Sequence, residues 1–304
     1  QMEKVVTEVV IIGSGAIGLS VAYQLIKQGK KEIWILEKES YLGGKNTLRC
    51  AGGVRSQFSS KQNIELSILN GKLLEEIIKI HNNLLNKCGY LFALTDDSSL
   101  KSYENAVSLQ NSLGVKTKWL SKSDISQLMP IINSENILAG TYLESDGLID
   151  VGWIISYYLK ILEDQGVVLR RSCKVNNIYH NRHGLKYVET DNFIIKADVI
   201  VNATGSDASD INRMLEIEYP IKAIKQQLFT TSEYMQYKNS YPVVIYPSVG
   251  LGFHKDGNGI LSGLHLEKDD GNRYLDRRWE IENFKLLVNE LKGSGELRVR
   301  SRWI

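Results

Sequence analysis

The fold is decided by one short stretch, Val9-Val10-Ile11-Ile12-Gly13-Ser14-Gly15-Ala16-Ile17-Gly18. Its four apolar residues predict a buried strand, and the apolar spacing from Ala16 to Gln28 predicts a helix that Gly29 ends. A second strand is predicted at Ile33–Leu36, directly before Glu37. Strand, glycine turn, helix and strand together make the βαβ unit that binds dinucleotides.

Each glycine of this turn has a physical reason. Gly13 permits the tight turn, Gly15 lets a pyrophosphate approach the backbone, and Gly18 lets the helix pack closely on the strand. Free N–H groups and the positive end of the helix dipole then favour the phosphates. Glu37 follows Gly18 by nineteen residues, where an acidic side chain reaches a ribose diol. The sequence therefore predicts dinucleotide binding.

The bulk composition is that of an ordinary globular protein. The chain has 304 residues, of which 43% are hydrophobic and 24% charged, enough for one large or two closely joined domains. The net charge of +2 gives no reason to expect nucleic acid as a partner. No apolar run approaches the length of a transmembrane segment, and no signal peptide is recognised.

Cysteine and histidine usage predicts no metal site. Cys50, Cys88 and Cys173 are widely spaced and form no CxxC pair, which argues against a disulfide framework and favours a cytoplasmic location. The five histidines show no metal-ligand spacing. Cys50 is more simply read as a small packing residue than as a reactive thiol.

The rest of the chain alternates between helical and strand patterns. Residues 41–58 are rich in Gly, Ser, Asn and Arg and are predicted as a loop at the carboxyl edge of the sheet. Helices are predicted at 62–81, 100–113, 151–164 and 273–291, and strands at 90–95, 117–120, 137–143, 221–230 and 243–246. Residues 197–205 are predicted as a buried strand that enters a glycine turn.

This order predicts an α/β fold in which a Rossmann-like nucleotide-binding domain carries an inserted mixed β-sheet substrate domain. Residues 1–90, 137–219 and 267–304 are assigned to the first domain, and residues 91–136 and 220–266 to the second.

The chain resembles the FAD-dependent amine and amino-acid oxidoreductases related to D-amino-acid oxidase. Its motifs are most similar to the flavin-carrying beta subunits of heteromeric sarcosine oxidase and dye-linked L-proline dehydrogenase. Four segments carry the resemblance: residues 10–38; residues 47–55, which resemble the loop around the flavin ring; residues 111–129 with 137–150; and residues 197–205, the second nucleotide-binding strand and turn.

The resemblance implies a set of FAD-binding residues. Gly13, Gly15, Ala16 and Ile17 would hold the pyrophosphate, Glu37 the ribose, and Lys38 would lie beside the adenine. The flavin loop would contribute Thr47, Arg49, Cys50, Ala51 and Gly52, and the remaining contacts would come from Val175, Ala203 and Gly205. Simple core packing is the alternative for Val175 and Ala203.

The same resemblance implies hydride transfer from the carbon alpha to an amine onto flavin N5. Such chemistry needs a group that neutralises the substrate carboxylate, and Arg55 is the first candidate because a guanidinium binds carboxylates through two hydrogen bonds. A contact with flavin or with a helix end is an equally good reading of Arg55. Tyr246, Phe253 and His254 are expected to form an aromatic wall that faces the flavin, with Tyr246 and His254 as catalytic candidates and ordinary sheet packing as the alternative.

Three departures from the family bear on activity. Phe58 stands where single-subunit sarcosine oxidases have a second arginine, which puts the carboxylate clamp in doubt. Leu261 stands where those enzymes place a lysine over the flavin, which favours a dehydrogenase over an oxidase. No histidine lies at 149–152, where heteromeric sarcosine oxidase attaches its flavin, so the FAD is expected to be non-covalent.

The last residues of the chain bear on which functions are expected. Residues 298–303 resemble the segment that returns to the FAD domain, and family members then continue through a closing segment, whereas this chain stops at Ile304. Either the chain is truncated, or a partner completes it, or activity has been lost. The expected function is FAD-dependent oxidation of an amino or imino acid such as proline, sarcosine or glycine, with an electron acceptor or partner subunit. The alternatives are a non-catalytic assembly subunit and, on the Rossmann motif alone, an NAD(P)-linked dehydrogenase.

Overall fold

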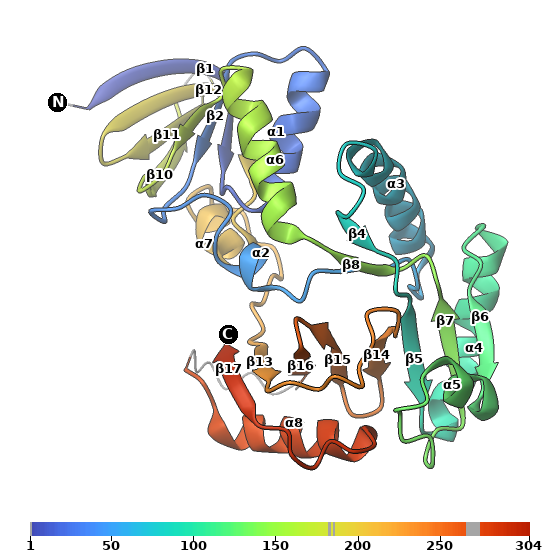
Figure 1. Ribbon diagram of the computed structural model, residues 1–304. Helices are drawn as coiled ribbons and strands as arrows, with labels where there is room; N and C mark the ends of the chain where they lie inside the picture. The colour runs from blue at the N-terminus through green and yellow to red at the C-terminus, as the bar shows by residue number, and fades with distance from the viewer. Residues whose placement is uncertain (1, 182–183, 185, 266–273) are drawn as a thin grey trace. The chain divides into compact units, whose positions relative to one another are not determined.

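The computed structural model describes residues 2–181, 184, 186–265 and 274–304. The chain forms two compact units (Figure 1): unit 1 comprises Gln1–Cys50 and Asp150–Ala223, and unit 2 comprises Ala51–Ile149 and Ile224–Ile304. These units divide the chain differently from the predicted domains, because residues 51–90, residues 137–149 and the final helix belong with unit 2. Of the helices described, none has the length and apolar character that a bilayer crossing requires.

Unit 1 is built on a six-stranded sheet with β1 near its centre. In sheet order the strands are β10 (Val175–His180), β11 (Lys186–Thr190), β12 (Phe193–Asn202), β1 (Glu3–Ile12), β2 (Ile33–Leu36) and β9 (Val168–Arg170). The β12, β1, β2 and β9 strands are parallel, whereas β10 and β11 are antiparallel additions. Its helices are α1 (Ala16–Lys27), α2 (Asn46–Arg49), α6 (Val151–Asp164), the 3-10 turn η1 (Gly205–Asp207) and α7 (Ala208–Arg213).

The βαβ prediction is confirmed in detail. β2 has the predicted bounds, and α1 ends one residue before the predicted end. β1 begins earlier than predicted, at Glu3, because β12 pairs with it along its whole length. Val9–Ile12 are all buried, as expected for a strand covered on both faces. α1 and α6 lie side by side (Figure 1).

Unit 2 holds a mixed sheet of eight strands. In sheet order they are β17 (Val299–Trp303), β13 (Gln227–Thr231), β16 (Gly259–Leu264), β15 (Leu251–Asp256), β14 (Val243–Tyr246), β5 (Tyr90–Leu94), β7 (Ala139–Leu143) and β6 (Lys118–Ser121). Only the β14–β5 pairing is parallel among the described pairs of this sheet. A small antiparallel sheet joins β3 (Gly53–Val54), β8 (Gly147–Ile149) and β4 (Leu85–Asn86), and the helices are α3 (Lys61–Ile78), α4 (Asp97–Ser112), α5 (Lys122–Leu128) and α8 (Arg277–Glu290).

Some of the predicted elements differ in the structure. Residues 41–58 are not wholly a loop, because they contain α2 and β3, which are too short to leave a periodic signal. The strand predicted at 221–230 begins only at Gln227. In the described part of the chain, Gln227 pairs with Leu264, the last residue of β16, so the pairing of β13 with β16 begins there. The helix predicted at 273–291 is α8, and Arg273 lies outside the described residues.

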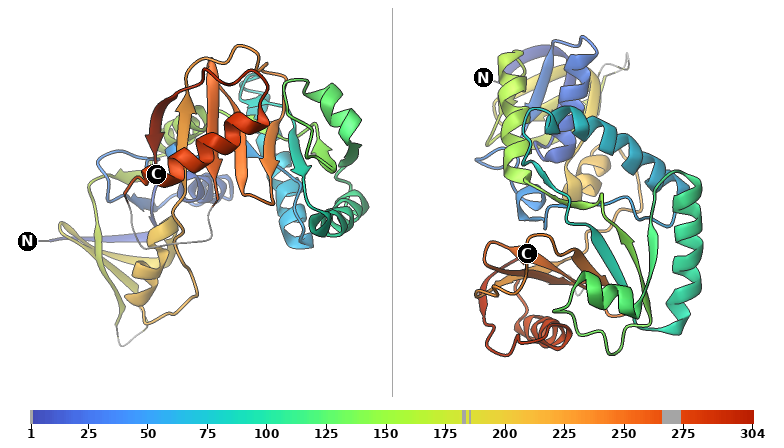
Figure 2. Two further views of the ribbon diagram at one scale, coloured as in Figure 1. Left: turned by 90° about the horizontal axis from the view of Figure 1, so that it is seen from below. Right: turned by 45° about the vertical axis from the view of Figure 1, so that its right-hand side comes forward.

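The α8 helix covers one face of the eight-stranded sheet. Figure 2 shows it lying across β13, β16 and β15. The cluster on this side, which we call the α8 face, includes Phe229, Val244, Tyr246, Phe253 and Leu287. Cross-strand pairing then places Ile245, Phe92, His254 and Leu261 on the opposite face, which we call the His254 face.

Candidate functional site

The glycine turn after β1 has no room for side chains. Gly13 has a φ of +103°, and a Cβ there would lie 2.5 Å from the carbonyl oxygen of Ala203. A Cβ on Gly18 would lie 2.0 Å from the carbonyl oxygen of Gly13. A Cβ atom does not approach a non-bonded backbone oxygen this closely, so both positions require glycine. The turn is thus held between β12 and α1.

The amino end of α1 presents backbone donors. Within the described part of the chain, the N–H groups of Gly15, Ile17 and Gly18 have no protein acceptor, whereas that of Ala16 donates to Thr47 Oγ1 at 3.1 Å. No acidic residue lies in the first turn of the helix. Free N–H groups and the positive end of the helix dipole make this a favourable place for phosphate oxygens.

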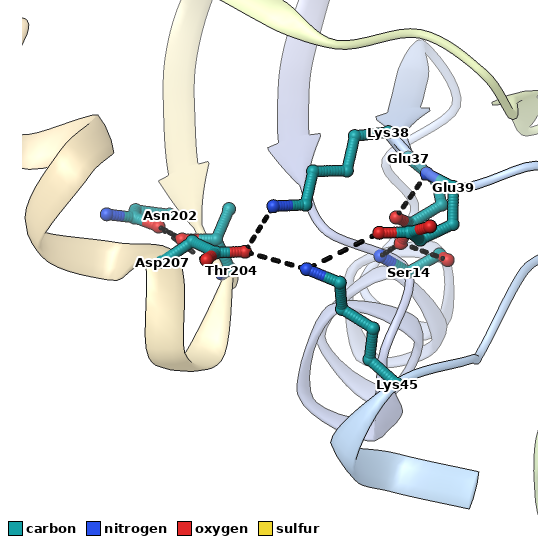
Figure 3. A network of polar contacts seen from close by, with 8 residues as sticks. All are labelled: Ser14, Glu37, Lys38, Glu39, Lys45, Asn202, Thr204 and Asp207. Atoms are coloured by element: carbon teal, nitrogen blue, oxygen red, sulfur yellow. Dashed lines mark hydrogen bonds and ion pairs between the residues drawn. The ribbon is translucent and has the colours of Figure 1, made fainter. Parts of the chain in front are cut away.

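Glu37 is tied to the glycine turn (Figure 3). Its Oε2 accepts from the backbone N–H of Ser14 at 3.0 Å and from Ser14 Oγ at 2.7 Å, and its Oε1 accepts from the N–H of Glu39 at 2.9 Å. Ser14 Oγ also accepts from the N–H of Gly43 at 3.0 Å. A carboxylate has about four acceptor sites, so Glu37 retains capacity for a further donor. Ser14 was missed by the sequence reasoning, although it lies inside the motif.

Asp207 joins the loops that follow β2 and β12 (Figure 3). Its Oδ2 lies 2.6 Å from Lys38 Nζ and 3.1 Å from Lys45 Nζ, and Lys45 Nζ also lies 3.4 Å from Glu39. Burial would raise the pKa of Asp207, but the two ammonium groups outweigh it and hold the pKa below its ordinary value. The predicted adenine-side residue Lys38 is therefore half of an ion pair. Sequence reasoning missed Lys45 and Asp207.

The other predicted cofactor residues lie in both units. Val175 is buried at the start of β10, and the Ala203 N–H donates to the carbonyl of Ile12 at 2.9 Å. Gly205 opens η1 with a φ of +60°. The boundary between the units falls inside the predicted flavin loop: Thr47, Arg49 and Cys50 belong to unit 1, and Ala51 and Gly52 belong to unit 2.

Arg55 is held by aromatic rings in unit 2. The carbon of its guanidinium lies 4.6 Å from the centre of the Phe58 ring and 5.3 Å from that of Phe92. Among the described residues, no carboxylate lies within ion-pair distance of it. Arg55 and Phe58 line a hollow of about 400 Å³ with Tyr90 and residues of α3. A cation supported by ring faces and without a partner anion is suited to bind one.

The structure brings Arg55 and His254 to one face of the sheet and Tyr246 to the other. Phe92, under the Arg55 guanidinium, shares the His254 face. Tyr246 instead stacks on Phe253, with ring centres 6.3 Å apart, in the core beneath α8. The grouping of Tyr246 with His254 in one aromatic wall is therefore wrong, because the β14–β15 register separates them.

The rings of His254 and Tyr246 are both buried in environments that disfavour their charged forms. Burial lowers the pKa of His254, and the backbone of Lys255 and Ala51 opposes this only in part. His254 Nδ1 lies 2.7 Å from the Lys255 carbonyl oxygen, while its buried Nε2 has no hydrogen-bond partner in the described chain. The imidazole is therefore neutral near pH 7. Burial also raises the pKa of Tyr246, whose hydroxyl faces Glu290.

A buried carboxyl group adjoins the Arg55 segment. Asp146 is 3% exposed, and its Oδ1 accepts from the N–H of Ser56 at 2.9 Å. Its Oδ2 accepts from Gln57 Nε2 at 3.4 Å. Burial raises its pKa to about 6, although these hydrogen bonds and the charge of Arg55 act in the opposite direction. Sequence reasoning did not single out Asp146.

The family follows from comparison with known proteins. Residues 8–292 match the family model described as "DAO: FAD dependent oxidoreductase". The chain therefore belongs to the DAO family of FAD-dependent oxidoreductases, as the resemblance predicted.

Individual relatives agree with this assignment. Dimethylglycine dehydrogenase of Rattus norvegicus is 26% identical over 86% of this chain, and pyruvate dehydrogenase phosphatase regulatory subunit of Mus musculus is 24% identical over 84%. The chain spans about a third of these relatives, 31% and 30% of their lengths. Among solved structures, L-proline dehydrogenase from P. horikoshii has a TM-score of 0.89 at 23% identity, covering 100% of this chain and 81% of its own. Glycine oxidase from Geobacillus kaustophilus has a TM-score of 0.84 at 17% identity, covering 98% and 81%.

The residues of unit 1 fit the cofactor that the family implies. The side-chain-free turn at Gly13 and the unpaired N–H groups of Gly15, Ile17 and Gly18 suit a pyrophosphate. The free acceptor capacity of Glu37 suits a ribose hydroxyl. FAD is the cofactor of the family, and the chemistry of these groups is compatible with its adenosine diphosphate part.

We predict that Gly13→Ala abolishes FAD retention. The new Cβ would overlap the Ala203 carbonyl and push the turn out of place. Gly29→Ala is the matched control: Gly29 also has a positive φ, +87°, but a Cβ there would meet nothing within 4 Å. The control should lose about 1 kcal/mol of stability and keep its flavin. FAD content after gel filtration and melting temperature test both variants; equal flavin loss in the two would contradict the prediction.

We predict that Asp146 makes stability depend on pH between about 4 and 6. Because its folded pKa of about 6 lies above 3.8, the ordinary value for an aspartate side chain, the folded state binds the proton more tightly than the unfolded state. Its contribution to the free energy of unfolding therefore falls as pH rises through this window, by up to roughly 3 kcal/mol. Asp146→Asn should lack this fall. Urea unfolding of both proteins at pH 4 and pH 7 measures the difference, and parallel pH profiles would refute it.

Proposed function

We propose that the protein oxidises the C–N bond of a small amino or imino acid, of the proline, sarcosine or glycine type, with FAD. We further propose that it acts as a dehydrogenase rather than an oxidase. The observation that carries the proposal is the unpaired Arg55 guanidinium beside a hollow of about 400 Å³. The volume lies in the range of small-molecule sites.

Arg55 would bind the carboxylate of the substrate. Its guanidinium offers two parallel N–H donors, which match the two carboxylate oxygens. The rings of Phe58 and Phe92 support the cation without neutralising it. Fixing the carboxylate would orient the rest of a small amino acid, and orientation is a large part of catalysis in such reactions. Phe58 stands where single-subunit sarcosine oxidases have a second arginine, and here its ring would support the guanidinium of Arg55.

Other residues would hold the cofactor and its surroundings. Bound FAD supplies a hydride acceptor for the carbon that carries the amine. The N–H groups of Gly15, Ile17 and Gly18 would bind its phosphates. The neutral His254, packed near the Ala51 backbone, would keep that part of the predicted flavin loop in place. With its Nε2 buried, His254 fits this supporting role better than direct contact with substrate.

The names of the relatives support an amino-acid substrate. Dimethylglycine dehydrogenase, L-proline dehydrogenase and glycine oxidase are all named for substrates with an amine next to a carboxylate. A guanidinium that binds the carboxylate would serve this whole class.

Leu261 supports dehydrogenase over oxidase. It is 7% exposed and pairs directly across from His254, so it lies on the same face as that residue. An apolar side chain there offers no charge to stabilise oxygen as it gains electrons, whereas a lysine would. A dye, a quinone or a partner subunit would then accept the electrons.

One relative favours a second candidate function. The matched mouse protein is named a regulatory subunit, so a non-catalytic, assembly role is compatible with this fold. The two functions differ in one observable. In a catalytic protein the flavin bleaches when an amine is added. In an assembly subunit no flavin bleaches with an amine.

We predict that anaerobic mixing with a panel of amino and imino acids bleaches the yellow flavin band. Arg55→Met should raise the KM for the best substrate about 100-fold, because two charge-assisted hydrogen bonds are lost. Arg300→Met, which changes an exposed arginine of β17, is the control and should leave KM unchanged. Protein that holds FAD but never bleaches would favour the assembly role. Protein that stays colourless after refolding with FAD would rule out the proposal.

We predict that dye reduction by the best substrate is at least about ten times faster than oxygen consumption. Leu261→Lys should raise oxygen consumption, because a cation near the site lowers the energy of reduced oxygen. Leu261→Met, which changes shape but not charge, should not. An oxygen electrode beside a dye assay measures both rates. Rapid oxygen consumption by the unaltered protein would contradict the dehydrogenase assignment.

A further inference from the structure

Asp146 belongs to a closed network of buried polar groups. Besides its contact with Asp146, Gln57 Nε2 donates to the Tyr90 carbonyl at 3.0 Å, and Gln57 Oε1 accepts from Thr141 Oγ1 at 2.9 Å. Asp146, Gln57 and Thr141 are each no more than 5% exposed. The network therefore fastens the segment Ser56–Gln57 to both β5 and β7, the strands of Tyr90 and Thr141.

The partners fix the orientation of every group in the network. Both oxygens of Asp146 face donors, from Ser56 and from Gln57. Turning the Gln57 amide over would bring its oxygen against the Tyr90 carbonyl. A side chain with one donor in place of an oxygen, such as asparagine, cannot satisfy both contacts. Only a carboxylate at 146 suits this arrangement.

Arg55 depends on this segment for its direction. Its own supports, the rings of Phe58 and Phe92, are contacts of low directionality. The backbone on either side of Ser56 therefore decides where the guanidinium points. A buried carboxylate is costly to keep, and an apolar residue of similar size is often the more stable choice at such a place. Among the described residues, Asp146 is the one acidic side chain that is buried.

We propose that Asp146 is a positioning residue, which holds Arg55 in the direction needed to bind the substrate carboxylate. The hydrogen bonds from Ser56 and Gln57 transmit this effect, and Asp146 itself touches no substrate. The inference rests on the proposed role of Arg55. It adds that carboxylate binding by Arg55 depends on the Asp146 carboxylate, which the role of Arg55 alone does not require.

A double-mutant cycle on the FAD-loaded protein tests the proposal. The probes are cyclopentanecarboxylate, which has the carboxylate but no amine, and pyrrolidine, which has the amine but no carboxylate. Isothermal titration calorimetry gives their dissociation constants. Asp146→Asn should raise the dissociation constant of cyclopentanecarboxylate about 10-fold or more and should change that of pyrrolidine by less than about 2-fold. In an Arg55→Met background the same change should have no further effect, because the group being positioned is gone.

Two further variants guard against a general loss of structure. Gln57→Met keeps the hydrogen bond from Ser56 to Asp146 and removes the links to Tyr90 and Thr141. It should therefore weaken the binding of cyclopentanecarboxylate to a smaller extent than Asp146→Asn. If Asp146→Asn does not fold, Gln57→Met takes its place in the test. Asn283→Ala removes a buried polar side chain on the α8 face and should leave both probes unchanged.

The outcomes separate the two claims. If Arg55→Met leaves the carboxylate constant unchanged, the proposed role of Arg55 is wrong and the inference falls with it. If Arg55→Met weakens the carboxylate but Asp146→Asn does not, only the inference is overturned. It is also overturned if Asp146→Asn weakens the probe equally in both backgrounds, or weakens pyrrolidine as much as the carboxylate.

Discussion

The close approach of the Gly13 turn to the Ala203 carbonyl is the constraint on which unit 1 depends. Two strands that lie far apart in the sequence, β1 and β12, run parallel side by side and end at the same edge of the sheet. The turn after one must pass the turn after the other, and a Cβ at Gly13 would close the gap to 2.5 Å. With the turn in place, α1 starts with its N–H groups free and Glu37 lies within reach of Ser14. The geometry of the glycine turn is thus a consequence of strand pairing.

The parts of this arrangement that are local in sequence could be predicted. The bounds of β2 and α1 follow from apolar periodicity, with Gly29 marking the end of the helix, all within forty residues of one another. The helix at Val151–Asp164 was predictable for the same reason, with Asp150 capping its first turn. Family membership was predictable because the motifs that carry it are short and contiguous.

The parts that depend on strand register could not be predicted. Tyr246 and His254 have the same parity, and alternation within one strand would place them on one side. In the hairpin, however, Val244 pairs with Phe253, so the even residues of β14 share a face with the odd residues of β15. A change of one residue in the turn reverses this outcome. Asp207 was equally out of reach, because 169 positions separate it from Lys38, and Asp146 and Gln57 are 89 apart.

The charges around the glycine turn explain why its backbone matters so much. Lys38 and Lys45 would be the obvious groups to attract phosphates, but Asp207 and Glu39 pair with them. Glu37 adds a further negative charge beside Ser14. Both lysine ammonium groups are therefore already paired with carboxylates. The phosphate binding that we propose would then rely mainly on the unpaired N–H groups and the dipole of α1, which act over short distances only. A site of this kind tolerates changes in its lysines far better than a displacement of its turn, and the steric limits at Gly13 and Gly18 prevent that displacement.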